Sequence, residues 1–195
     1  MLVSLLRSGL ALGAALFSLL SFADIESDFN KLKSHPQDYT TFGTICEEVA
    51  RVRLQERYGT DNYEFKVGIA YTGHGRTLGE LDVTVFRKGD HKAIVVAEVK
   101  CWRKLHQGLM KAKKQLQRFQ KNIALESIES MVSTGPEAQT FKPSQFDESP
   151  TFLTISQKGG IKAGFDLDIG LDIDEVKNLR AMLIRCQEHG NCPRK

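Results

Sequence analysis

The sequence lacks several features that would assign it to a familiar class. It has no internal repeat and no low-complexity tract, and its four cysteines include no CxxC pair. No two histidines have the spacing of zinc ligands, which makes a zinc site the less favoured use of the cysteines. The aspartates between positions 166 and 174 lack the spacing of an EF-hand loop, and strand alternation and helix capping account for them.

A strong overall charge is missing as well. The chain has 27 basic and 24 acidic residues, so its net charge indicates no particular partner. One stretch differs, because Val99–Lys121 contains no acidic residue at all. Its basic residues are Lys100, Arg103, Lys104, Lys111, Lys113, Lys114, Arg118 and Lys121. Such a local field suits a polyanion such as nucleic acid.

The first residues predict an export signal. One cation, Arg7, precedes an uncharged and mostly apolar run that ends at Ala23. This run is shorter than the ~20 residues of a membrane-spanning helix. We therefore expect residues 1–23 to be removed as a signal peptide and residues 24–195 to form a single domain, exported to the periplasm or secreted, without stable membrane association. An uncleaved anchor is the alternative.

The even number of cysteines suits an exported protein, since disulfides persist outside the cytosol. Four cysteines allow three pairings, and the sequence does not decide between them. Cys186 and Cys192 flank a short loop that contains Gly190, which makes their pairing the simplest. Cys46 and Cys101 would then remain as the second pair.

Hydrophobic periodicity predicts an α/β (α+β) protein. The predicted elements are a helix over Thr44–Tyr58, strands over Tyr63–Tyr71, Leu78–Arg87 and Lys92–Cys101, a helix over 103–130 and a strand over Thr151–Ser156. We expect Ser133–Pro150 to be a mobile loop, and a C-terminal hairpin with a strand over Ala163–Ile169. A last helix should begin at a capping box, Asp172–Glu175.

Three ionisable residues stand out in the predicted hairpin Gly79–Trp102. Glu98 and Lys100 lie two apart on an apolar strand and therefore project to one face. Asp82, on the partner strand, could lie beside Glu98. Two adjacent buried carboxylates repel each other unless a cation lies between them, and oxygen ligands of this kind suit magnesium. The alternative is a structural cluster of ion pairs.

The predicted helix over 103–130 has two distinct sides. Its apolar stripe consists of Leu105, Leu109, Ala112, Leu116, Phe119 and Ile123. A second edge carries Gln107, Lys111, Lys114, Arg118 and Lys121, at the same helical spacing. Charged edges of this kind are commonly just solvated. Its position after the unusual strand favours contact with nucleic acid.

Asp82 followed by Glu98-Val99-Lys100 resembles the motif of the PD-(D/E)XK nuclease superfamily, with Leu81 in place of the proline. The predicted order from Thr44 to Ser156 is similar to the αβββαβ core of that restriction-endonuclease-like fold, which implies a central mixed sheet flanked by helices. The Gly79–Asp82 approach is particularly similar to that of Holliday-junction-resolvase-like members, many of which act as dimers. A homodimer is therefore one option for the assembly.

The resemblance also implies roles for residues on the two helices. It implies a third metal ligand on the first helix, Glu47, four residues after Gly43, with Glu48 as the second choice. More weakly, it implies roles for Gln115 and Phe119 on the helix after the lysine.

The sequence thus predicts an exported nuclease that needs Mg²⁺, or Mn²⁺ as a substitute. We expect DNA in preference to RNA as the substrate, and internal cleavage in preference to cleavage from ends. The predicted site residues are Glu47, Asp82 and Glu98 as metal ligands, Lys100 as the catalytic lysine, and Lys111, Lys114, Gln115, Arg118 and Lys121 as nucleic-acid contacts. The alternatives are a non-catalytic nucleic-acid-binding module and a structural or inhibitor-like envelope protein.

Four further residues receive no catalytic role from the sequence. Glu80 shares a face with Asp82 and is either a further ligand or a strand-end charge. His74 and His106 are expected to be exposed. Trp102 could stack on a base, but packing at the end of a strand is the commoner fate of a single tryptophan.

Overall fold

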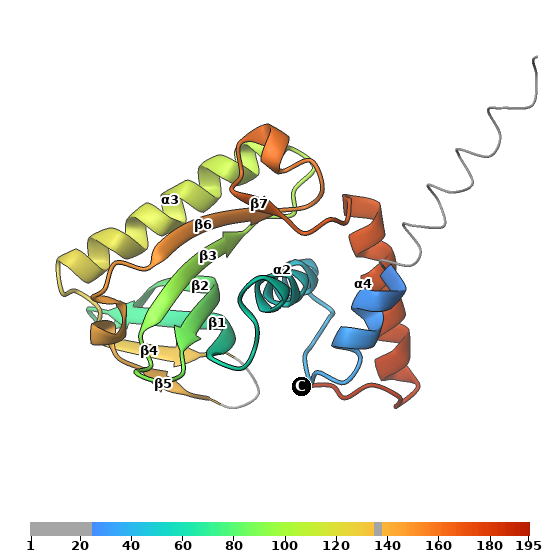
Figure 1. Cartoon of the computed structure of the whole chain (residues 1–195), viewed down its shortest axis with the longest axis horizontal. Coiled ribbons are helices and arrows are strands. Elements are labelled where there is room, and N and C mark those ends of the chain that lie inside the picture. The colour runs from blue at the N-terminus through green and yellow to red at the C-terminus, as the bar shows by residue number, and fades with distance from the viewer. Residues whose placement is uncertain (1–24, 135–137) are drawn as a thin grey trace, which may run out of the picture.

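The computed structural model describes residues 25–134 and 138–195. Within them, seven strands form one open sheet in the order β5-β4-β1-β2-β3-β6-β7 (Figure 1). The predicted signal peptide, residues 1–23, lies outside the described residues.

The predicted order of elements is present. Two short strands and a 3₁₀ turn are added between the helix that begins at Leu105 and the strand that begins at Thr151. The helices are α2 (Phe42–Tyr58), α3 (Leu105–Ala124) and α4 (Ile173–Glu188), with 3₁₀ turns η1 (Pro143–Phe146) and η2 (Ile161–Ala163) and a further helical segment over residues 25–32. The strands are β1 (Tyr63–Gly73), β2 (Arg76–Arg87), β3 (Ala93–Val99), β4 (Ser130–Ser133), β5 (Thr140–Phe141), β6 (Thr151–Ser156) and β7 (Leu167–Asp168).

The sheet is mixed, as the sequence predicts. Strands β1, β2 and β3 are antiparallel neighbours, whereas β6 lies parallel to β3. A parallel neighbour needs a long crossover, and α3 provides much of it. The end of β3 therefore lies in the interior of the sheet, between β2 and β6.

Helices cover both faces of the sheet (Figure 1). Val95, Ala97 and Val99 of β3 join a core that includes α2 and α4, whereas Val96 joins the core beneath α3. This arrangement explains why β3 is a nearly continuous apolar run, because a strand with two buried faces has no solvent side. It also explains why Glu98 is buried.

The prediction of a mobile loop over 133–150 is wrong for the residues described there, which are not a plain loop. The segment contains β5 and η1, and β4 ends within it. Phe141 stacks on Phe86, and Phe146 contacts both Phe86 and Phe119 edge to face. Burial of these aromatic rings holds β5 and η1 on the core. The prediction failed because a two-residue strand and a 3₁₀ turn are too short to produce a periodic pattern.

Two further predictions need correction. The helix predicted over 103–130 ends at Ala124, because the chain turns at Glu126 (φ 51°) to enter β4. The predicted C-terminal hairpin is wrong, since β7 is parallel to β6 and only two residues long. The turn η2 and Gly164 (φ 96°) carry the chain round to β7, which pairs with the last two residues of β6. The predicted capping box at Asp172–Glu175 is confirmed.

The packing of η1 yields a test of the corrected segment. We expect Phe146→Ala to lower the free energy of unfolding by about 3–5 kcal/mol, because it removes a buried ring. Ser144→Ala, in the same turn but exposed, is the matched control and should change it by less than about 0.5 kcal/mol. Urea unfolding measures both. Equal, small effects would mean that the segment is only loosely attached.

Candidate functional site

The hairpin of β2 and β3 places Asp82 and Glu98 beside each other. Val83 pairs with Ala97 across the two antiparallel strands, so the next positions along each strand are Asp82 and Glu98. The Val99 backbone N–H donates to Asp82 Oδ2 at 2.8 Å, which orients that carboxylate at the end of β3. A buried backbone donor is thereby satisfied by a side chain rather than by another strand.

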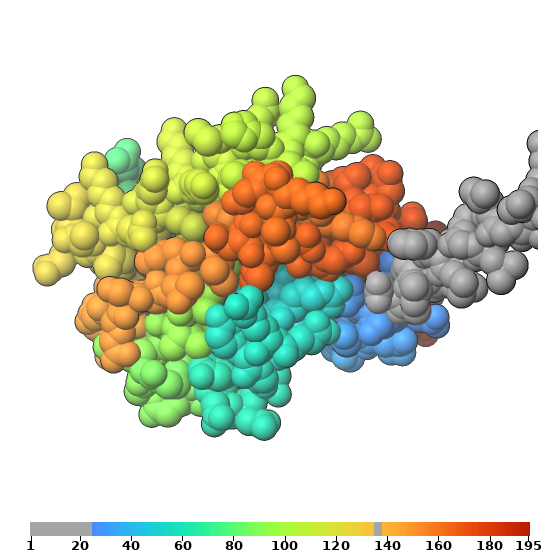
Figure 2. All heavy atoms as spheres, turned by 45° about the horizontal axis from the view of Figure 1, so that its top comes forward, coloured from blue at the N-terminus to red at the C-terminus, as the bar shows by residue number. Residues whose placement is uncertain are grey.

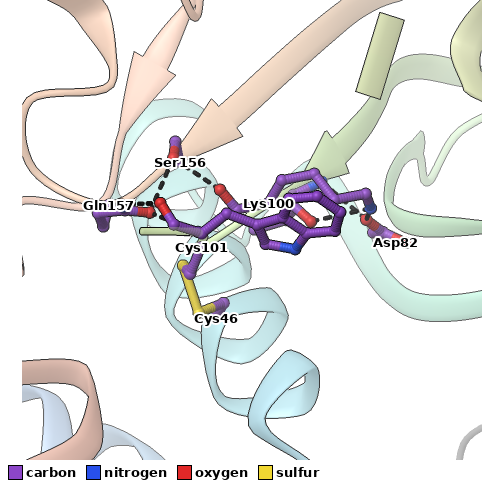
Figure 3. Close-up of a disulfide and its surroundings, with 8 residues drawn as sticks. Cys46, Asp82, Lys100, Cys101, Ser156 and Gln157 are labelled. Carbon is purple, nitrogen blue, oxygen red and sulfur yellow. Dashed lines mark hydrogen bonds and ion pairs between the residues drawn. A yellow bond between two sulfur atoms is a disulfide. The ribbon is translucent and has the colours of Figure 1, made fainter. Parts of the chain in front are cut away.

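Lys100 lies between the two carboxylates. Its Nζ is 2.6 Å from Asp82 Oδ2, 3.1 Å from Glu98 Oε2 and 3.0 Å from the Val99 carbonyl oxygen. The side chain of Glu98 is only 1% exposed, and those of Asp82 and Lys100 are 9% and 11% exposed. Figure 3 shows Lys100 directed toward Asp82. The ammonium thus offsets much of the cost of burying these carboxylates.

The compensation is incomplete. Glu98 Oε1 is buried and has no hydrogen-bond partner. Burial and the neighbouring Asp82 raise the pKa of Glu98 to about 9. Burial disfavours the ammonium of Lys100, but Asp82 and Glu98 outweigh this effect and raise its pKa. The site therefore has more buried carboxylate than one lysine can neutralise.

Helix α2 adds Glu47 to this site. Glu47 lines a pocket of about 240 Å³ together with Val99 and Lys100. Burial and then Asp82 raise the pKa of Glu47 to about 8. A Cβ at Gly43, one turn earlier, would lie 3.4 Å from Glu47 Oε1, so the glycine leaves this carboxylate room.

Glu48, the second choice from the sequence, has a different environment. Its Oε2 accepts from Arg51 Nε at 2.7 Å, and its Oε1 lies 3.6 Å from His35 Nε2. The Gln37 amide also donates to Oε1. Glu48 is therefore held by partners on the other side of α2, and the structure brings Glu47, not Glu48, to the pocket.

Helix α3 contributes a polar wall and a basic edge. Gln115 and Lys111 line the same pocket, and Gln115 Oε1 is buried without a partner. Lys114, Arg118 and Lys121 are exposed farther along the helix. Figure 2 shows side chains from the first half of α3 projecting at the top of the view. Phe119, by contrast, is a core residue and has no place at the site.

Both disulfides that the sequence suggests are formed, Cys46–Cys101 and Cys186–Cys192. The first joins α2 to the segment after β3 (Figure 3). Its cysteines are the sequence neighbours of Glu47 and Lys100. It therefore ties together the two elements that carry the site. Two disulfides are typical of a protein in an oxidising compartment. Over the described residues, no helix has the length and apolar character that a bilayer crossing requires.

Two polar residues at the site were missed by sequence reasoning. Ser156 Oγ donates to the Lys100 carbonyl oxygen at 2.7 Å. Gln157 holds the backbone of Trp102, since its Oε1 accepts from the Trp102 N–H and its Nε2 donates to the Trp102 carbonyl oxygen. The signal that could have found them is a pair of polar residues, Ser156 and Gln157, at the end of a predicted strand.

The donors present fit a hard divalent cation. Asp82, Glu98 and Glu47 offer carboxylate oxygens, and Glu98 Oε1 has no other partner. Among the described residues, no group of three or more His, Cys, Asp or Glu side chains has converged in a metal-binding arrangement. Lys100 Nζ lies where Asp82 and Glu98 meet. Binding of a cation there would require this ammonium to move.

Similarity to other proteins supplies no assignment. Comparisons with protein-family models, curated proteins and solved structures found no match. The function of the protein therefore has to be inferred from the chemistry of the site: a lysine among carboxylates, an adjacent polar pocket and a basic helix edge.

The raised pKa of Glu98 predicts how stability depends on pH. The folded state keeps a proton that the unfolded chain releases, so stability is lost as pH rises from the unfolded value of 4.5 toward the folded value of about 9. We expect Glu98→Gln to flatten the fall in the free energy of unfolding over this range. Urea unfolding at several pH values in EDTA measures this pH dependence. If the free energy of unfolding of Glu98→Gln fell as steeply with pH as that of the wild type, the raised pKa of Glu98 would be contradicted.

The two disulfides should differ in their effect on stability. Cys46 and Cys101 are 55 residues apart, and Cys186 and Cys192 only 6. On loop-closure entropy, we expect the double variant Cys46→Ala/Cys101→Ala to lose about 4 kcal/mol and Cys186→Ala/Cys192→Ala about 2 kcal/mol. Urea unfolding compares them. A larger loss for the short loop would contradict this account.

Proposed function

We propose that the protein is an exported, metal-dependent nuclease that hydrolyses phosphodiester bonds, with DNA as the expected substrate. The observation that carries the proposal is the position of Lys100 Nζ, 2.6 Å from Asp82 and 3.1 Å from Glu98 in a buried site. A lysine beside two carboxylates supplies the charges that phosphodiester hydrolysis needs, and clusters of perturbed groups are enriched at functional sites.

The element order supports this proposal. Helix α2, strands β1, β2 and β3, helix α3 and strand β6 follow in the order of the PD-(D/E)XK core, with β4, β5 and η1 inserted before β6. The motif residues Asp82, Glu98 and Lys100 lie together at the end of the central hairpin, and Glu47 joins them from the first helix. These are the positions that the resemblance implies.

Each residue then has a role that follows from its environment. Asp82, Glu98 and Glu47 would hold the divalent cation, whose chemistry is Lewis-acid stabilisation of the negative charge that develops on the phosphate oxygens. In the structure the neighbouring carboxylates raise the pKa of Lys100, so it carries a proton. Moved from between them by the cation, its Nζ can donate a hydrogen bond to the attacking water or to a phosphate oxygen. The Val99 N–H keeps Asp82 oriented throughout.

The basic edge of α3 would hold the substrate backbone. Lys111, Lys114, Arg118 and Lys121 follow the helical spacing that puts them along one edge, and all four are exposed. Contacts of this kind position a nucleic acid without reading its sequence. Gln115 lines the pocket, and its buried Oε1 has no partner, so it could accept a hydrogen bond from the substrate or a water.

One observation favours a second candidate, a non-catalytic nucleic-acid-binding module. The ammonium of Lys100 already satisfies one oxygen of each hairpin carboxylate, so the ion pairs could be purely structural. The basic edge would then bind nucleic acid without turnover. This module would bind equally well with and without divalent cations.

Cleavage by the mature protein separates the two candidates. We expect nicking of supercoiled plasmid with Mg²⁺, none with EDTA, and a loss of at least about 100-fold in rate for Lys100→Ala, because a charged group at the reacting phosphate is removed. Lys177→Ala, an exposed lysine on α4, is the matched control and should keep the wild-type rate. No cleavage by folded protein with either Mg²⁺ or Mn²⁺ would favour the binding module.

A further inference from the structure

Trp102 is the only tryptophan of the chain. The sequence favoured packing at the end of a strand, but the side chain is not buried. It is 37% exposed, although it directly follows a buried cysteine of the Cys46–Cys101 disulfide. It also lines the pocket of about 240 Å³ that contains Glu47 and Lys100. An exposed aromatic residue at the mouth of such a pocket is a ready contact surface for a ligand.

The backbone beneath this side chain is firmly held. Gln157 is only 5% exposed and makes both backbone hydrogen bonds of Trp102, at 3.1 Å to the N–H and 2.8 Å to the carbonyl oxygen. Ser156 Oγ, which donates to the Lys100 carbonyl oxygen, lies 3.0 Å from Gln157 Oε1. A contact surface that is fixed before binding loses little conformational freedom when a ligand arrives.

A cation lies against the indole ring. Lys111 Nζ is 4.9 Å from the ring centroid, a cation–π distance. Lys111 is itself exposed, so its flexible side chain can exchange this contact for a phosphate while a planar group stacks on the ring. A planar aromatic group linked to an anion is the chemistry of a nucleotide.

We propose that Trp102 and Lys111 form a subsite for one unpaired nucleotide, with the base stacked on Trp102 and a phosphate bound by Lys111, and that the substrate is therefore single-stranded or locally unpaired nucleic acid. Bases within a duplex are stacked on both faces and cannot offer one to a side chain, whereas unpaired bases can. That this unpaired nucleic acid is cleaved rests on the proposed nuclease function. Its binding at Trp102 and Lys111 does not.

The single tryptophan makes binding directly measurable. Wild-type protein in EDTA and the Lys100→Ala variant are titrated with a single-stranded oligonucleotide, the matching duplex, and an abasic strand of equal length that keeps the phosphates. We expect quenching of Trp102 fluorescence by the single strand, and much weaker quenching by the duplex and the abasic strand. Using both proteins guards against misfolding of the variant.

Variants then assign the contact to the ring and to the cation. With a fluorescently labelled single strand, Trp102→Ala should weaken binding roughly 5- to 100-fold, and Trp102→Phe should recover part of it. Lys111→Gln should weaken binding and lower its salt dependence. The controls are Lys177→Gln, an exposed lysine on α4, and Leu125→Ala, an exposed apolar residue at the end of α3; neither should change the affinity.

The inference and the nuclease proposal can fail separately. Quenching as strong with the abasic strand as with the normal strand, or unchanged single-strand affinity in Trp102→Ala, would overturn the subsite and leave cleavage untouched. Quenching and base-dependent binding in a protein that never cleaves would overturn the nuclease and uphold the subsite.

Discussion

The structure depends on how one buried ammonium is shared between two buried carboxylates. Lys100 contacts both Asp82 and Glu98 at the end of a strand that is covered on both faces. Without this lysine the hairpin would bury two negative charges side by side, at a cost of several kcal/mol. With it, one oxygen of Glu98 still has no partner, and the pKa values of Glu98 and Glu47 remain raised. That remaining deficit of positive charge is what the proposed cation would remove.

The elements that carry the site are tied together by bonds that do not depend on the ion pairs. The Cys46–Cys101 disulfide links α2 to the end of β3, and Ser156 with Gln157 anchors the same segment to β6. The site therefore sits at a point where a helix and two parallel strands are cross-linked. Such support keeps the spacing of functional groups fixed, which catalysis and preorganised binding both require.

Much of the site could be predicted from the sequence. Strand alternation puts Glu98 and Lys100 on one face, and the hairpin brings Asp82 to them, because both are local rules with a fixed period. The distinction between Glu47 and Glu48 needed tertiary contacts, since the partners of Glu48 come from residues 35–37 and from Arg51. Short elements without periodicity, such as β5 and η1, could not be predicted. The contact between the Trp102 backbone and Gln157 could not be predicted either, since Gln157 is 55 residues away along the chain.

The most direct test of the central claim is a calorimetric titration of Mn²⁺ or Mg²⁺ into the mature protein near pH 7, repeated in buffers of different ionisation enthalpy. The account predicts one bound cation with release of protons, because Glu47 and Glu98 have pKa values of about 8 and about 9 and must lose protons to bind a metal. Asp82→Asn should abolish the heat. Binding without proton release, or no binding at millimolar concentrations of either cation, would contradict it.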